Sequence, residues 1–402
     1  MEWKEVRLGD VCEIKGGKRL PKGINLITQK NSHPYIRVRD LGKSKTLELN
    51  SSYEYVDEIT QKQIQRYITL KGDILISIVG TIGLIAIVGG SLNGANLTEN
   101  CVKLVKLDNI DSEYLYYYLK SPFGQQNISR GTVGAVQAKL PIKNIQEFNI
   151  NCPVLISDQR RIASILSSLD RKIELNNKIN ADLEEMAQAI FKNWFVDFEP
   201  FKDGKFVDSE LGMIPEGWKV GSLDEIAEIT MGQSPAGNSL NENREGMIFY
   251  QGSSDFSFRF PGIRVFTTEP KRLAVANSVL FSVRAPVGDI NVAQEECCIG
   301  RGVASIKSKY GHDSYLFYTM KSLHKLFDSF DGEGTVFGSI NKKTLSAIQI
   351  LLPSDGIVEQ FNNIASSFDN RIRSLSEESS RLSLLRDTLL PRLMSGELEV
   401  PE

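Results

Sequence analysis

Two long stretches of the chain carry apolar side chains at alternating steps of four and three residues. The first series, which follows a possible helix-capping pair at Ser157-Asp158, is Ile162, Leu166, Leu169, Ile173, Asn176, Asn180, Leu183, Ala187, Ile190 and Trp194. Adding 199 to each position gives the second series: Phe361, Ala365, Phe368, Ile372, Leu375, Ser379, Leu382, Arg386, Leu389 and Leu393. Eight of the ten positions in each series are apolar, and this 3.5-residue period is typical of a coiled-coil seam.

The two series predict two long helices, residues 156–195 and 356–397, each on the order of 58 Å in length. A lone helix would expose such a stripe, so we expect the helices to bury it against each other. The linker of residues 196–217 is short, which favours antiparallel pairing. Parallel pairing stays open because an extended linker reaches roughly 70 Å. Two independent domains, each capped by its own helix, are a further alternative.

The remaining stretches, residues 1–155 and 218–355, have a different pattern. Short strand-like runs such as 73–79 and 278–283 alternate with glycine turns and with amphipathic segments such as 112–120 and 313–325. We therefore expect an α+β chain, in which two mixed globular domains are joined by two long helices that form an antiparallel coiled coil. Residues 398–402 are a short tail.

The second half of the chain is a diverged copy of the first half. The offset between matching blocks falls from 215 to 205, 201 and then 199 residues, and the blocks keep their order. A period near 200 residues is far longer than the roughly 20–50 residues of a solenoid repeat. The duplication predicts pseudo-two-fold symmetry. Matching residues include Trp3 and Trp218, Tyr35 and Tyr250, Ser77 and Ser282, Tyr117 and Tyr318, and Asp170 and Asp369.

The charge of the chain is divided unevenly along the repeat. The net charge of the 402 residues is −3, but residues 1–155 contain 20 Lys and Arg against 15 Asp and Glu. Residues 215–355 contain 14 against 16. A locally basic surface suits a polyanionic partner whatever the total charge.

Several classes of function are disfavoured by the sequence. The five cysteines form no C-x-x-C pair and the three histidines lack ligand spacing, so we expect no metal site and no disulfide framework. The [DN]-P-P-[YF] signature, a G-x-x-x-x-G-K-[ST] loop and a catalytic triad are also missing, so we expect no catalytic residue in this chain. The apolar run 74–88 has only 15 residues, too few for a membrane span, and we expect a cytoplasmic protein.

Candidate contacts to a polyanion in the first repeat start with a glycine loop that carries Lys15, Lys18, Arg19 and Lys22. Glycines let a backbone approach phosphate closely, although a solvated basic turn explains the pattern equally well. Arg37 and Arg39 alternate with apolar residues, which would place both on one face of a strand. Surface salt bridges are an alternative at least as strong for these two arginines.

Further candidates lie in polar loops and in the second repeat. A glycine loop precedes the last strand of each repeat and exposes residues suited to phosphate or adenine contacts: Thr132, Gln137 and Lys139 in the first, and Thr335, Ser339, Asn341, Lys342 and Lys343 in the second. The other candidates are Arg244, Gln251, Arg259, Arg264, Arg284 and Arg301. The aromatic clusters at 114–118 and 315–318 have helical spacing, so we expect them to pack in cores rather than stack on bases.

Several segments together resemble the specificity subunit of type I restriction–modification systems. Each long helix begins near a P-x(4–6)-Q segment, Pro153 to Gln159 and Pro353 to Gln360. The resemblance covers essentially the whole chain. Its other segments are the linker 195–200 with 209–218, the run 72–77, the run 282–288 and the Gly-Gln-Ser-Pro stretch 232–235.

The resemblance implies a non-catalytic DNA reader. Each globular part would be a target-recognition domain that reads one half of a bipartite sequence in double-stranded DNA. The paired helices would set the spacing and dock two methyltransferase subunits, and restriction/translocase subunits would complete the complex. S-adenosylmethionine would be bound by the methyltransferase subunits, and ATP and Mg by the restriction subunits, with no cofactor on this chain and no membrane partner.

The sequence departs from perfect duplication at Gly16–Pro21, which is more basic than the matching stretch 232–235. We therefore expect the two recognition domains to read different sequences. Two other functions remain as alternatives: a coiled-coil scaffold with protein partners only, and an enzyme that modifies DNA itself.

Overall fold

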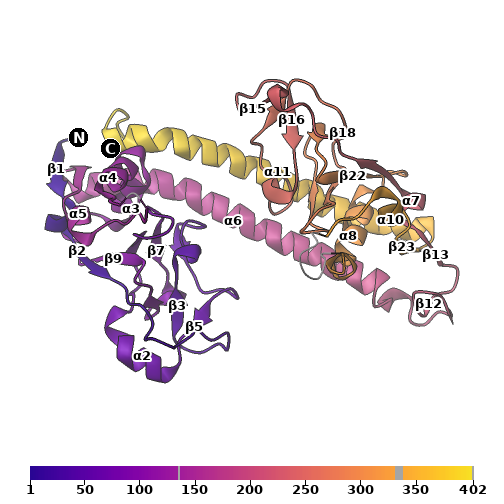
Figure 1. Ribbon diagram of the computed structural model, residues 1–402, viewed down its shortest axis with the longest axis horizontal. Helices are drawn as coiled ribbons and strands as arrows, with labels where there is room; N and C mark the ends of the chain where they lie inside the picture. The colour runs from indigo at the N-terminus through magenta and orange to yellow at the C-terminus, as the bar shows by residue number, and fades with distance from the viewer. Residues whose placement is uncertain (135, 331–337, 401–402) are drawn as a thin grey trace. The chain divides into compact units, whose positions relative to one another are not determined.

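The computed structural model describes residues 1–134, 136–330 and 338–400, which form two compact units. Unit 1 comprises Met1–Lys178 with Ser376–Glu402, and unit 2 comprises Ile179–Leu375. Each unit therefore contains one globular part together with half of each long helix (Figure 1).

The two long helices are α6, Ile156–Phe195, and α11, Asp355–Ser395. Helix α6 begins one residue before the predicted capping pair, so Asp158 lies in the first turn, where its charge suits the helix dipole. Helix α11 ends two residues earlier than the predicted 397. Gly396 follows it with a φ of 77°, a left-handed conformation that ends helices, and its backbone lies against the Trp3 ring.

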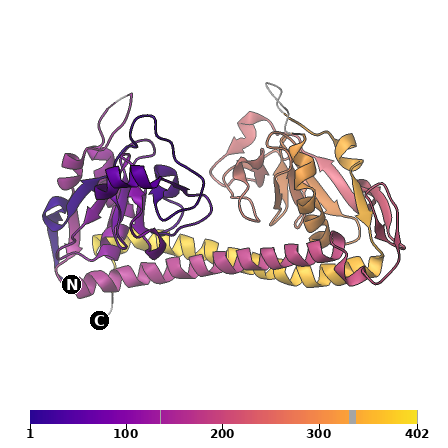
Figure 2. The ribbon, with the colours of Figure 1, turned by 90° about the horizontal axis from the view of Figure 1, so that it is seen from below.

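The helices pair antiparallel within each unit. In unit 1 the first half of α6 packs on the last half of α11, and in unit 2 the last half of α6 packs on the first half of α11 (Figure 1 and Figure 2). All twenty seam positions are buried or half-buried. The polar seam residue Asn176 donates to Ser379 Oγ at 3.3 Å and to Glu378 Oε2 at 2.9 Å across the pair. A polar seam contact of this kind fixes the register.

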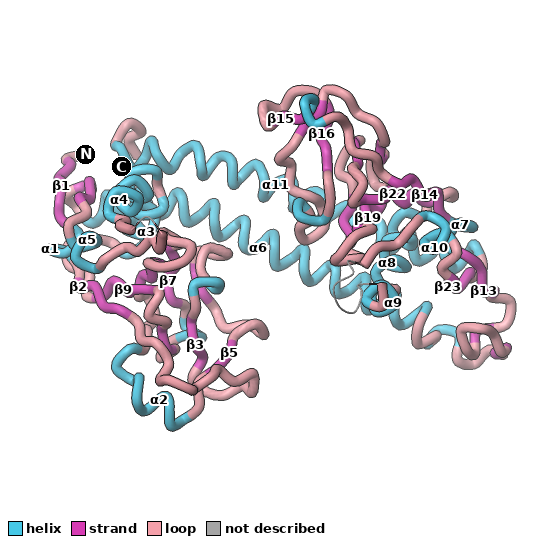
Figure 3. The backbone as a smooth tube through the Cα atoms, viewed as in Figure 1, coloured by secondary structure: helices cyan, strands magenta, loops and turns pink. Residues whose placement is uncertain are grey.

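Unit 1 contains three sheets, whose strands stand out from the helices in Figure 3. Strand β1, Trp3–Arg7, pairs antiparallel with β10, Asn149–Pro153. A five-stranded sheet has the order β2 (Glu13–Gly16), β9 (Cys101–Val105), β6 (Ile74–Ser77), β7 (Ile85–Val88) and β4 (Thr46–Leu47). A third sheet has the order β5 (Glu54–Tyr55), β3 (Pro34–Ile36) and β8 (Asn96–Leu97). The helices are α1 (Leu8–Val11), α2 (Glu58–Ile64), α3 (Ser112–Lys120), α4 (Pro122–Gly131) and α5 (Ile142–Gln146).

Unit 2 repeats this plan. Strand β13, Lys219–Ser222, pairs antiparallel with β23, Gln349–Leu352. The main sheet has the order β14 (Ala227–Met231), β22 (Val303–Ser308), β19 (Val279–Ser282) and β20 (Ile290–Val292). The second sheet has the order β15 (Leu240–Asn241), β17 (Phe266–Thr267), β16 (Met247–Tyr250), β21 (Cys297–Ile299) and β18 (Leu273–Ala274). The helices are α7 (Leu223–Ile226), α8 (Asp313–Ser322), α9 (His324–Asp328) and α10 (Lys342–Ser346).

The segment expected to be a linker is folded, and the described residues of the tail pack against unit 1. Residues 196–217 contain a hairpin, β11 (Phe206–Val207) with β12 (Ile214–Pro215). Phe198 and Phe201 from this segment pack on the Trp218 ring, with centroids 5.5 and 5.2 Å away. Leu398 and Val400 of the tail pack against the core of unit 1. Both segments bury apolar side chains, which the polar residues around them obscured in the sequence.

The cores explain two further patterns of the sequence. The apolar run 74–88 forms the buried antiparallel strands β6 and β7, and the tyrosines of α3 are buried, which confirms that they pack. In the described part of the chain, no helix combines the length and apolar character that a membrane span requires. All five cysteines are buried free thiols, and burial raises the pKa of Cys12 to about 12.

A buried cation anchors the globular part of unit 2 to both long helices. Arg259 has only 3% of its surface exposed, and it forms ion pairs with Glu184 of α6 and with Asp369 of α11, the latter at 2.8 Å. It also donates to the hydroxyl of Tyr318 at 2.9 Å and lies 4.0 Å from the Phe317 ring centroid. We call this set the Arg259 clamp.

Unit 1 has a corresponding clamp around Lys45. The Lys45 carbonyl accepts from Ile87 N–H, as the Arg259 carbonyl accepts from Val292 N–H, so the two cations hold equivalent positions. The Lys45 ammonium donates to Glu113 at 2.8 Å and to Ser167 of α6 at 2.9 Å, 5.0 Å from the Tyr117 ring. The Tyr117 hydroxyl donates to Asp170, which pairs with Arg386 of α11 at 2.7 Å. We call this set the Lys45 clamp.

The burial of the seam leads to a direct test of helix pairing. Replacing Leu375, which is 1% exposed, by alanine should lower the free energy of unfolding by about 2–5 kcal/mol because a cavity forms. Leu384 lies on the same helix but is 70% exposed, so Leu384→Ala should change it by less than about 0.5 kcal/mol. Urea denaturation of the full chain, followed by circular dichroism, measures both. Equal losses in the two variants would contradict a buried seam.

The Arg259 clamp predicts a pH dependence. Burial opposes ionisation of Glu184, but Arg259 and Lys321 outweigh it and keep the pKa of Glu184 below its ordinary value. The ionised carboxylate therefore stabilises the folded state above the unfolded-state pKa of about 4.3, and this contribution disappears as the pH falls through the lower folded-state pKa. Glu184→Gln should be less stable at pH 7 and should lose less stability between pH 5 and 3.

Thermal unfolding midpoints at a series of pH values measure this difference. Glu185→Gln is the matched control, because Glu185 is the exposed neighbour on the same helix. The clamp would be refuted if Glu184→Gln and wild type lost stability in parallel on acidification.

Candidate nucleic-acid interface

Four loop segments of unit 1 are joined edge to edge by backbone hydrogen bonds. We call these segments, residues 17–22, 97–101, 78–79 and the described residues of 132–140, the first rim. In each bond a backbone N–H donates to a carbonyl: Gly17 to Cys101 (3.0 Å), Lys18 to Leu97 (2.8 Å), Ile78 to Asn100 (2.8 Å) and Leu140 to Ile78 (3.0 Å). The bonds hold parts of the chain far apart in sequence in a single row at the ends of the strands.

Unit 2 contains the same row, which we call the second rim: residues 232–235, 299–303, 283–284 and 338–340. The equivalent bonds run from Gly232 to Val303 (2.9 Å), from Gln233 to Ile299 (2.9 Å), from Val283 to Gly302 (3.0 Å) and from Ile340 to Val283 (3.1 Å). Gln251 joins this rim because its carbonyl accepts from Gly302 N–H at 3.2 Å. The candidate Thr335 lies outside the described residues.

The first rim brings together five candidates: Lys18, Arg19, Lys22, Gln137 and Lys139, all of them exposed. The Lys18 ammonium lies 5.6 Å from the Tyr67 ring centroid, and Arg19 Nε donates to Glu99 Oε1 at 2.6 Å. Partial burial opposes ionisation of Glu99, but the hydrogen bond from Arg19 outweighs it and lowers the pKa of Glu99. The surface is basic, with one internal carboxylate.

Thr132 also lies in the first rim but has another role. Its hydroxyl donates to the Ile128 carbonyl at 2.8 Å, at the end of α4. It is half-buried, so its position serves the helix end rather than an exposed contact.

The second rim brings together Gln251, Arg284, Arg301 and Ser339, which are exposed. Arg284 and Arg301 are both exposed, and neither forms an ion pair with another of the residues that the structure describes. Ser234, which was not among the candidates, completes the group: its hydroxyl donates to Gln251 Oε1 at 3.3 Å and accepts from Arg301 N–H at 3.3 Å. Ser234 matches Arg19 in the repeat, and this match could have identified Ser234 as a candidate from the sequence.

The pair Arg37 and Arg39 is not placed as predicted. Strand β3 ends at Ile36, and both residues lie beyond it, so they do not share a strand face. Both guanidinium groups instead contact Glu54, Arg39 at 2.9 Å. The surface salt bridge is therefore the arrangement found, because the paired strand β5 places this carboxylate beside them.

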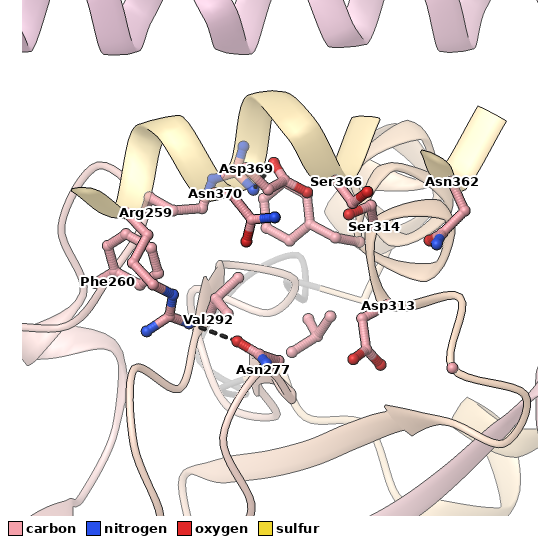
Figure 4. Close-up of a pocket in the computed structure, with 14 residues that line it drawn as sticks. Arg259, Phe260, Asn277, Val292, Asp313, Ser314, Asn362, Ser366, Asp369 and Asn370 are labelled. Carbon is pink, nitrogen blue, oxygen red and sulfur yellow. Dashed lines mark hydrogen bonds and ion pairs between the residues drawn. The ribbon is translucent and has the colours of Figure 1, made fainter. Parts of the chain in front are cut away.

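The prediction that Arg259 contacts a nucleic acid is wrong. The Arg259 clamp holds this side chain in the interior of unit 2, where a nucleic acid cannot reach it. Figure 4 shows the cavity beside the clamp, with Asp369, Ser366 and Asn362 of α11 along one wall. The cavity measures about 160 Å³. Ser314, which lines this cavity, matches Glu113 of unit 1 in the repeat.

The remaining candidates lie outside the rims. Lys15 on β2 and Lys106 both pair with Glu13 and lower its pKa to about 2. Arg264 pairs with Asp255 at 3.1 Å. Asn341 caps α10 by accepting from Thr344 N–H at 3.0 Å, which places Lys342 and Lys343 in the first turn of that helix. Arg244 is exposed in a left-handed turn with φ of 64°.

Metal ligation has no basis in the part of the chain that the structure describes, where His, Cys, Asp and Glu form no ligand group. The rims instead offer guanidinium, ammonium and amide groups on a fixed backbone. Such groups bind phosphates and the edges of bases.

The same arrangement of loops occurs twice on an α+β frame. The chain matches the family "Type I restriction modification DNA specificity domain" over residues 1–185 and again over residues 215–383. It is 31% identical to the putative type I restriction enzyme MjaX specificity subunit of Methanocaldococcus jannaschii, over 99% of this chain and 94% of that protein. It is 26% identical to the type I restriction enzyme HindI specificity subunit of Haemophilus influenzae, over 65% and 71%.

The fold has a similar solved counterpart. The crystal structure of the type I restriction–modification S subunit from M. genitalium superposes with a TM-score of 0.59 at 18% identity, and covers 98% of this chain and 96% of that one. The chain belongs to the type I restriction modification DNA specificity family, of which it carries two domains. It is a specificity subunit, a recognition component rather than a catalytic one. The fold class expected from the sequence is confirmed.

The close packing of the rims predicts which glycines are required. A Cβ at Gly232 would fall well inside contact distance of the Gly300 carbonyl oxygen, whereas a Cβ at Gly237 would meet nothing within 4 Å. Gly232→Ala should therefore displace the second rim and destabilise unit 2 by about 1–3 kcal/mol. Gly237→Ala should leave both unchanged.

Hydrogen exchange of residues 299–303, together with thermal unfolding, separates the two glycine variants. Faster exchange in Gly232→Ala alone is the expected result. Equal exchange in both variants would mean that the 232–235 segment is not held against residues 299–303.

Proposed function

We propose that the chain reads a bipartite sequence in double-stranded DNA, with one half-site at each rim. The observation that carries the proposal is that the two rims share one backbone arrangement and differ in their exposed side chains. Backbone contacts position a reader, whereas base contacts specify a sequence. A constant frame with variable side chains suits two half-sites of different sequence.

Within each rim, the type of each exposed side chain indicates whether it suits a phosphate or a base. Lys18, Lys22 and Lys139 present point charges that suit phosphates, and Arg19, Arg284 and Arg301 present planar guanidinium groups that suit guanine. Gln137 and Gln251 suit adenine. We propose these residues as the DNA contacts and Lys15, Arg37, Arg39 and Arg259 as structural.

The paired helices are the proposed spacer and docking surface. Their seam is buried, yet Leu175 and Met186 of α6 and Leu384 of α11 are 52%, 51% and 70% exposed. Exposed apolar side chains on helices suit a protein partner. We propose that two methyltransferase subunits dock there and that restriction/translocase subunits join them in the cytoplasm. S-adenosylmethionine would then belong to the methyltransferase subunits, and ATP and Mg to the restriction subunits.

The spacing between half-sites provides the test. Mapping methylated adenines genome-wide in cells that carry the system yields both half-sites and the gap between them. Purified complex should bind this duplex with affinity that falls log-linearly with salt concentration. Inserting two or three base pairs into the gap should abolish specific binding, because a fixed spacer holds the two rims at one separation.

A duplex with the same insertion outside the half-sites is the control and should bind as the original does. Binding that is indifferent to the gap length would contradict the spacer. A complex that recognises no bipartite sequence would contradict DNA reading altogether and would favour a protein-only scaffold.

A further inference from the structure

The two rims place an arginine on opposite sides of the same backbone contact. The equivalent hydrogen bonds of the rims align Arg19 with Ser234, and Glu99 with Arg301. In the first rim the arginine is Arg19, in the 17–22 segment. In the second rim it is Arg301, in the 299–303 segment, which matches 97–101 of the first rim. The residue that faces the arginine is Glu99 in the first rim and Ser234 in the second rim.

In the first rim the arginine is held but not buried. Arg19 Nε donates to Glu99 Oε1 at 2.6 Å, and the Arg19 side chain is 79% exposed. An exposed ion pair of this kind contributes little stability. Replacing the Arg19–Glu99 contact by contacts with a ligand therefore costs little free energy. The Glu99 carboxylate is then available as a hydrogen-bond acceptor.

In the second rim the arginine is placed beside an amide. Arg301 stands between Gly300 and Gly302, and a Cβ at Gly302 would collide with the Gln251 carbonyl oxygen. The glycines thus allow the turn to lie close against Gln251. Ser234 joins the two, since its hydroxyl donates to Gln251 and accepts from the Arg301 N–H.

These side chains differ in the bases that they select. Arginine pairs bidentately with guanine, glutamine with adenine, and glutamate accepts from the amino group of cytosine. We infer that the facing pairs Arg19–Glu99 and Ser234–Arg301 are specificity-determining positions, so that the two half-sites are read differently at this point. The inference rests on the proposed DNA-reading function and names the residues that make the two rims unlike.

The test places the arginine and glutamate of the first rim at the matching positions of the second rim, 234 and 301. The double variant S234R/R301E is prepared as a full chain in complex with the proposed methyltransferase subunits. Duplexes randomised over both half-sites are selected by binding and sequenced. The base preference should change at one or two positions of the second half-site and stay the same in the first. Affinity for the original target should fall about ten- to a hundred-fold.

A second variant tests the same inference if the double variant does not fold. Arg301→Lys retains the charge but loses the bidentate fork, so discrimination at one base pair should weaken more than overall affinity. Arg264→Glu is the matched control, because Arg264 is an exposed arginine of unit 2 outside the rim, and the selected sequence should not change. Thermal unfolding checks that each variant is folded.

The outcomes distinguish the two proposals. If wild type selects no bipartite sequence, the DNA-reading function fails. If wild type selects one and both Ser234/Arg301 variants select the same one, the inference fails. Uniform weakening for all sequences, with a smaller salt dependence, would assign Arg301 to a phosphate and would also overturn it.

Discussion

The structure depends on a buried cation in each unit that ties the globular part to the paired helices. Burying a charge is costly unless it is paired, so the Arg259 clamp supplies Glu184, Asp369 and the Tyr318 hydroxyl. The Lys45 clamp does the same with other partners. Glu184 and Ser167 belong to α6 and Asp369 belongs to α11, so each clamp joins a globular part to a long helix. Removing Arg259 would take a buried partner away from Glu184, whose side chain is only 6% exposed, and would cost on the order of 3–5 kcal/mol.

The internal duplication shows which parts of this architecture are constrained. Where the repeats must share a frame, they agree. Strands β1 and β13, the buried tyrosines Tyr117 and Tyr318, and the rim backbone are equivalent. Where they face solvent at the rims, they differ in charge. The rim backbone does not depend on its exposed side chains, because surface substitutions change the free energy of unfolding little. Those side chains can therefore differ between the repeats. That separation is the physical requirement for a reader whose two ends recognise different sequences.

Much of the frame was predictable because its signals are local. The seam period predicted α6 with the bounds found and α11 to within two residues, and amphipathic spacing predicted α3 as Ser112–Lys120. The rims were only partly predictable, since a bond such as Gly17 to Cys101 joins distant segments. Arg259 was misread as exposed because its partners lie 75 and 110 residues away. Loop arginines look alike in sequence until the structure shows which have buried carboxylates beside them.

Polar contacts across the seam fix the register of the two long helices. A purely apolar antiparallel pair is able to slip by a heptad, which moves one helix along the other by about 10 Å. In DNA that distance corresponds to about three base pairs. In unit 1 the Asn176–Ser379 and Asp170–Arg386 contacts join α6 to α11, and a slip would separate them and leave polar groups buried without partners. In unit 2 Arg259 joins Glu184 on one helix to Asp369 on the other. Both helices are continuous, so each unit independently forbids the slip, and the register that a spacer needs is determined twice.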